Sequence, residues 1–144
     1  MDIPAFSIFS ALSEVVVTVI VLYAILGNMR GGALRWKLLG AVLAFELCVN
    51  VVYMAIRAAH ADSDSSIAGA MKLFLAAHGI LSLLMFAGLI VLYLLAVVDE
   101  KMGRPSWFRR HNVMTWAFLV FWMVSVLSGE AIFVWRYLMP PANA

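Results

Sequence analysis

Four ionisable side chains lie inside apolar stretches of this sequence: Glu14, Glu46, His78 and Glu130. An acidic residue at the centre of a membrane helix costs about 2.5–3.5 kcal/mol on insertion scales. Three carboxyl groups together therefore oppose insertion by several kcal/mol, and folding alone does not require them. Ionisable residues in such surroundings are expected to mark a functional site.

The first chemistry that these groups offer is metal binding. Imidazole and carboxylate ligands suit copper, iron, manganese or zinc, depending on geometry, and the candidate ligands are His78, Glu130 and Glu46. Bundles with di-metal carboxylate sites use Glu-x-x-His motifs. This sequence contains no Glu-x-x-His and no His-x-x-His, so the spacing does not favour a di-metal site of that kind.

Two further chemistries remain open. A carboxyl group in a low-dielectric interior can exchange protons near neutral pH, so His78 beside Glu130 or Glu14 would form a proton-accepting pair, with or without a quinol. Ligation of heme b needs two axial ligands at one depth. Only His78 among the histidines lies deep in an apolar stretch, so a methionine such as Met85 would have to be the second ligand.

The composition indicates that membrane helices position these groups. The chain has 144 residues, 65% hydrophobic and 12% charged, and its mean hydropathy is +1.01, whereas a soluble domain carries about 25% charged residues. Four stretches reach the roughly 20 apolar residues that a bilayer span needs: residues 5–26, 38–58, 70–97 and 113–138. The short loops predict one all-α transmembrane domain over residues 1–144, a four-helix up-down-up-down bundle.

The loop charges predict how the bundle lies in the membrane. The first and third connections hold seven of the ten Lys and Arg residues, and the middle connection is acidic. The positive-inside rule places both termini on the outer side of a bacterial-type inner membrane. We expect no removable signal peptide, because the N-terminus lacks a basic region and a cleavage pattern. We expect the lipid bilayer, and no nucleic acid, as a partner.

Each ionisable group belongs to a polar row at helical spacing. The rows are Ser7, Ser10, Glu14 and Thr18; Glu46, Asn50, Tyr53 and Arg57; Phe74, His78, Ser82 and Met85; and Met123, Glu130 and Tyr137. At ~1.5 Å per residue, one polar group from each helix reaches a layer about 12–14 Å below the outer surface. We expect one binding site near that layer, formed by Glu14, Glu46, Asn50, His78 and Glu130.

The second half of the sequence carries a more specific pattern: His78, then Arg110-His111 at the end of a basic loop, Trp122 in mid-stretch, and Ser128-Gly129 near its end. Over residues 75–138 this pattern resembles the YozB-type family of small four-helix membrane proteins. Some members are associated with assembly of heme-copper terminal oxidases, so the resemblance implies a respiratory-membrane role in heme or copper handling. Trp36 stands where the family commonly has a His, and the three intramembrane Glu residues have no counterpart in it.

The combined interpretation is a small subunit or assembly factor of a respiratory complex, heme-copper oxidase-type or quinol-linked, that contacts other membrane subunits. We do not expect an enzyme in its own right. The candidate cofactors are copper or iron, heme b, or a quinol. In an alternative interpretation the chain is an accessory subunit whose polar rows only pack helices and partners, because interhelical hydrogen bonds contribute about 0.6 kcal/mol each. Cys48 is expected to be a small buried thiol.

Overall fold

The computed structural model describes residues 5–59 and 69–138, and for residues 53–59, 70 and 136 it describes the backbone alone. Almost all of these residues are helical. The helices are α1 (Ala5–Met29), α2 (Trp36–Ala59), α3 (Gly69–Lys101), α4 (Trp107–Arg110) and α5 (Asn112–Phe133), and α5 continues into a π-helical turn, η2 (Val134–Leu138). The predicted all-α class is confirmed.

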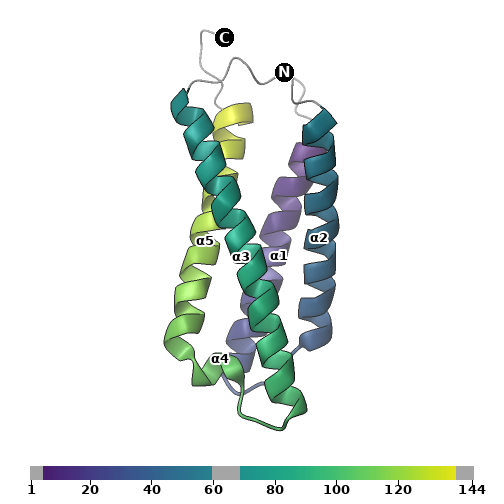
Figure 1. Ribbon diagram of the computed structural model, residues 1–144, viewed down its shortest axis with the longest axis vertical. Helices are drawn as coiled ribbons and strands as arrows, with labels where there is room; N and C mark the ends of the chain where they lie inside the picture. The colour runs from purple at the N-terminus through teal and green to yellow at the C-terminus, as the bar shows by residue number, and fades with distance from the viewer. Residues whose placement is uncertain (1–4, 60–68, 139–144) are drawn as a thin grey trace.

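The four long helices lie side by side in an elongated arrangement (Figure 1). α1 packs against α2 and α5, and α3 packs against the same two helices, so α2 and α5 lie diagonally opposite each other. In the view of Figure 1, α1 and α3 run downward along the chain, whereas α2 and α5 run upward. α4 contacts α1, α3 and α5 at the lower end, which we call the basic end because it carries Arg30, Arg35, Lys37, Lys101, Arg104, Arg109 and Arg110.

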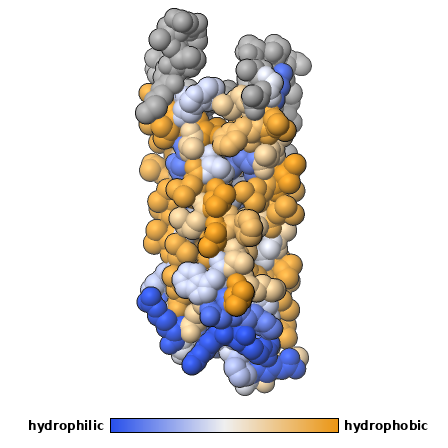
Figure 2. Space-filling view, turned by 90° about the vertical axis from the view of Figure 1, so that its left-hand side faces the viewer, coloured by the Kyte–Doolittle hydropathy of each residue, from blue (hydrophilic) through white to orange (hydrophobic). Residues whose placement is uncertain are grey.

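Three helices are long and apolar enough to cross a membrane, counting only residues that the structure describes: α1, α3 from Met71 to Lys101, and α5. Many of their large apolar side chains are exposed, as a lipid-facing surface requires. Figure 2 shows this apolar surface along the molecule and a hydrophilic zone at the basic end. These are the features of a membrane protein.

The tightly packed core lies in the half of the molecule near the basic end. Its fully buried side chains include Val21, Ile25, Leu39, Leu89 and Phe108. In the opposite half, which we call the terminal half (residues 5–16, 44–52, 69–88 and 127–138), no residue whose side chain is described is buried. All the predicted site residues belong to this less tightly packed half.

The basic end contains structure that hydropathy did not predict. Asp99 is buried and pairs with Arg110 at 2.7 Å and with Arg104 at 3.7 Å, which ties the end of α3 to α4. Asn28 is also buried; its Nδ2 donates to the carbonyl oxygen of Gly32 at 2.9 Å, and its Oδ1 accepts from the Ser106 hydroxyl. These contacts explain why α1 and α3 run beyond their predicted ends at residues 26 and 97.

The expectation of a buried thiol at Cys48 is wrong, because this side chain is exposed. It lies in the terminal half of α2, between the exposed residues Leu47 and Val51.

Candidate functional site

Three helices meet at Gly129 of α5. A Cβ atom at this position would lie 3.0 Å from Cε1 and 3.4 Å from Nε2 of His78 in α3, and 3.5 Å from Oε2 of Glu14 in α1. Because Nε2 and Oε2 both lie within 3.5 Å of the same point, they are separated by at most twice that distance. The missing side chain of Gly129 therefore lets the imidazole and the carboxyl group approach the same spot.

A hydroxyl group fixes the orientation of the His78 ring. His78 Nδ1 lies 2.8 Å from Ser128 Oγ, and Ser128 Oγ donates to the carbonyl oxygen of Ser125 at 2.7 Å. A hydroxyl has one proton to give, so Ser128 accepts from His78 Nδ1–H. In the neutral imidazole Nε2 then carries a lone pair. This acceptor atom is the one that lies beside Gly129 and Glu14.

Two further carboxyl groups lie near this pair. Glu46 of α2 and Glu130 of α5 are within Coulombic range of Glu14, and all three side chains are half-buried. Oε1 of Glu130 is buried and has no hydrogen-bond partner in the described part of the chain. Charged carboxylates at such proximity repel one another, which favours a proton or a hydrogen-bonding ligand between them.

Asn50, the fifth predicted site residue, stands apart. Its side chain is exposed, and its Nδ2 donates to the backbone oxygen of Glu46 at 2.8 Å and to Glu46 Oε2 at 3.5 Å. It therefore supports Glu46 and does not contact His78, Glu14 or Glu130. The side chains of Tyr53 and Arg57, which continue this row, lie outside the described residues.

The polar rows of α1 and α3 face α5. Trp122 Nε1 donates to Thr18 Oγ1 at 3.2 Å, and Ser125 Oγ donates to Ser82 Oγ at 3.3 Å. The Ser7 and Tyr137 hydroxyls, from α1 and η2, lie 3.3 Å apart. Together these contacts join α5 and η2 to the two helices that carry Glu14 and His78.

The predicted metal ligands are not arranged as a metal site. Across residues 5–59 and 69–138, no three His, Cys, Asp or Glu side chains come together as a group that could hold a metal ion. Neither His78, Glu130 and Glu46 nor any other described set supports the copper or iron site.

Heme b fits no better. His111 lies at the basic end, between α4 and α5, with its ring centroid 4.6 Å from that of Trp107, whereas His78 lies in the terminal half of α3. His60 lies outside the described residues. Met85 is two turns from His78 on the same helix, so the two cannot bind opposite faces of one heme.

No family model, curated protein or solved structure matches this chain. The resemblance to the YozB-type family therefore stays a prediction that rests on the residues that suggested it.

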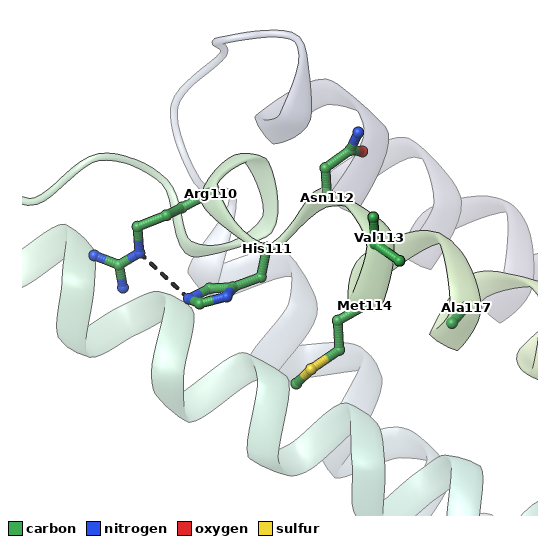
Figure 3. Close-up of a pocket in the computed structure, with 6 residues that line it drawn as sticks. All are labelled: Arg110, His111, Asn112, Val113, Met114 and Ala117. Atoms are coloured by element: carbon green, nitrogen blue, oxygen red, sulfur yellow. Dashed lines mark hydrogen bonds between the residues drawn. The ribbon is translucent and has the colours of Figure 1, made fainter.

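A shallow, open pocket lies at the basic end, around the Arg110-His111 pair that the sequence pattern singled out. Figure 3 shows its lining residues, Arg110, His111, Asn112, Val113, Met114 and Ala117. The pocket is open and has a volume of about 400 Å³. Besides the Arg110-His111 pair, its signal in the sequence is the abrupt change from Arg-Arg-His-Asn to an apolar run.

Proposed function

We propose that this chain forms a four-helix up-down-up-down bundle in a bacterial-type inner membrane, with both termini on the outer side. We further propose that it is a subunit or assembly factor of a respiratory complex, heme-copper oxidase-type or quinol-linked. In this proposal the cluster of Glu14, Glu46, His78 and Glu130 exchanges protons with a quinol near the outer surface. The apolar surface and the charges of the basic end support the membrane placement.

The observation that carries this function is the position of His78 Nε2. Ser128 holds the opposite ring nitrogen, and Gly129 allows Nε2 and Glu14 Oε2 to share one small space. A histidine and a carboxylate so placed can accept the two protons that leave a quinol when it is oxidised. The two electrons would pass to a redox centre of the partner subunit.

The packing of the terminal half supports a ligand of this kind. No described side chain there is buried, so the polar side chains of the cluster stay accessible to a ligand. The unpartnered Oε1 of Glu130 offers a further acceptor for a ligand hydroxyl. A quinol head group has two hydroxyl donors and an apolar ring, which match these surroundings.

A quinol titration tests this function. The full-length protein in nanodiscs is titrated with a short-chain ubiquinol under reducing conditions, and binding is followed by quenching of tryptophan fluorescence. We expect saturable binding that weakens at least about tenfold in Glu14→Gln and in His78→Gln, the loss of roughly one hydrogen bond to a buried group. Glu100→Gln is the matched control, because Glu100 is an exposed carboxylate at the basic end.

Two results would reject the quinol site. One is quenching that does not saturate in the wild-type protein. The other is equal binding by Glu14→Gln and the Glu100→Gln control. Purification of the tagged wild-type chain from native membranes would then identify its partner subunits and test the respiratory assignment separately.

A second candidate function is a non-catalytic accessory subunit. The hydrogen bonds Trp122–Thr18, Ser125–Ser82 and Ser7–Tyr137 favour it, because they are contacts between helices that need no ligand. This candidate predicts that Glu14→Gln lowers the amount of assembled complex but leaves electron transfer per complex unchanged. Reduced electron transfer at normal assembly would contradict it.

A further inference from the structure

The pocket between α4 and α5 presents hydrogen-bond donors that are held in place. Arg110 NH2 donates to the buried carboxylate of Asp99 at 2.7 Å, and Arg110 Nε donates to His111 Nε2 at 3.3 Å, the dashed line in Figure 3. The remaining terminal nitrogen of Arg110, NH1, has no hydrogen bond to any described residue. An oriented guanidinium with free N–H groups is suited to an oxyanion such as phosphate.

His111 adds a second donor to the same pocket. Its ring lies against that of Trp107, with centroids 4.6 Å apart and planes tilted by 34°. Because Nε2 accepts from Arg110, the proton of the neutral imidazole is on Nδ1. The pocket thus offers Arg110 and His111 as neighbouring donors for one anionic group.

The charge around the pocket also favours an anion. The basic end carries seven Lys and Arg side chains. Its acidic side chains in the described residues are Asp99, which is already paired with two arginines, and Glu100. The local potential is therefore positive, which attracts negatively charged groups in a membrane surface.

An exposed apolar stripe leads away from the pocket along α5. Val113 is 84% exposed and lines the pocket itself. Val120, Val124 and Leu127 follow at helical spacing and are 57%, 49% and 60% exposed. A small soluble phosphate would not contact this stripe. A phospholipid would use both features, because its headgroup is polar and its acyl chains are apolar.

We propose that Arg110 and His111 in this pocket bind the phosphate of one anionic phospholipid, such as phosphatidylglycerol, whose acyl chains lie along the α5 stripe. This site lies at the opposite end of the molecule from the Glu/His cluster. It depends on the membrane placement but not on proton exchange or quinol binding.

Native mass spectrometry of the full-length protein in a neutral detergent tests this site. Phosphatidylglycerol and phosphatidylcholine with identical acyl chains are added separately, and bound lipids are counted. We expect one phosphatidylglycerol to bind at least about fivefold more tightly than phosphatidylcholine. This is the gain in affinity that one basic side chain provides near an anionic lipid headgroup. The obvious variant, Arg110→Gln, would also leave Asp99 without its closest partner, so a second variant is needed.

Asn112→Asp is that variant. It places a negative charge in the pocket without touching the Asp99–Arg110 pair, and an acidic residue in the first turn of α5 suits the helix dipole. Lys37→Gln is the matched control: it also lowers the net charge by one, but Lys37 lies at the start of α2, diagonally opposite α5. We expect Asn112→Asp to lose the preference for phosphatidylglycerol and Lys37→Gln to keep it.

Three outcomes would overturn the proposal. Equal binding of the two lipids would show that the pocket does not recognise a negative headgroup. An equal loss in Asn112→Asp and Lys37→Gln would show that the overall charge of the basic end, and not the pocket, attracts the lipid. Displacement by glycerol phosphate at the same concentration as the lipid would show a site for soluble phosphates.

Discussion

His78 Nδ1 lies 2.8 Å from Ser128 Oγ, across fifty residues of sequence and between two different helices. This contact decides which nitrogen of the imidazole faces Glu14. A neutral His78 in the wild-type protein should carry its proton on Nδ1.

Ser128→Ala removes the acceptor for that proton. We expect the imidazole to populate both tautomers, since the ring loses the bond that distinguishes its two nitrogens. The ¹⁵N chemical shifts of labelled His78 measure the two populations. Ser128→Thr should restore the single tautomer. Ser13→Ala is the control because, among the described residues, Ser13 bonds only to the backbone of its own helix, at Ser10. An unchanged tautomer in Ser128→Ala would contradict the assignment.

Gly129→Ala tests the shared space beside His78. Its new methyl group would lie 3.0 Å from His78 Cε1, so the ring has to move, and such overpacking costs about 1–3 kcal/mol of unfolding free energy. Gly79→Ala is a matched control in α3, where a Cβ meets nothing within 4 Å. The control should be neutral or stabilising by up to ~1 kcal/mol, because alanine favours a helix. Denaturation in detergent gives both values, and equal behaviour of the two variants would refute the close approach.

Asp99→Asn tests the connection between α3 and α4. We expect a loss of about 1–3 kcal/mol, because the Arg110 guanidinium loses a charge-assisted bond to a buried partner. Arg104→Gln should cost at most ~1 kcal/mol, since Arg104 is 3.7 Å from Asp99 and 54% exposed. Unfolding free energies of the two variants should therefore differ. If Arg104→Gln lost as much unfolding free energy as Asp99→Asn, Arg104 and not Arg110 would be the main partner of Asp99.

Thr18→Val and Trp122→Phe test whether the polar rows stabilise the fold. Trp122 Nε1 donates to Thr18 Oγ1 at a buried position, and interhelical bonds in membrane proteins couple by about 0.6 kcal/mol, up to ~1.7. A double-mutant cycle separates this coupling from the loss of indole packing. A coupling energy near zero would remove the main support for the accessory-subunit candidate.

Hydropathy located the long helices well, because an apolar stretch of this length has few other stable states in lipid. It did not locate their ends. Asn28 extends α1 through a contact with Ser106, 78 residues away, and no local signal reports such a partner. The short helix α4 was missed for a related reason: its Ser106 N-cap lies in a charged loop, directly after Pro105.

Helical spacing and depth predicted His78 beside Glu130 or Glu14, and left open which of the two carboxyl groups comes closer. They could not predict the part played by Gly129, since close approach depends on the offset between neighbouring helices. Nor could they show that the Asn50 amide bonds to Glu46 in its own helix instead of joining the other groups. Side-chain rotamers decide that choice, and a linear pattern does not contain them.

The uneven packing of the two halves sets the order in which the molecule opens. Local unfolding begins where few side chains are buried, so the terminal half should separate first while the residues around Phe108 and Ile25 still hold the helices together. The helices thus stay packed together at the basic end while the terminal half opens by local unfolding. A large ligand from the bilayer can reach the Glu/His cluster during such opening, with no dedicated channel and without global denaturation.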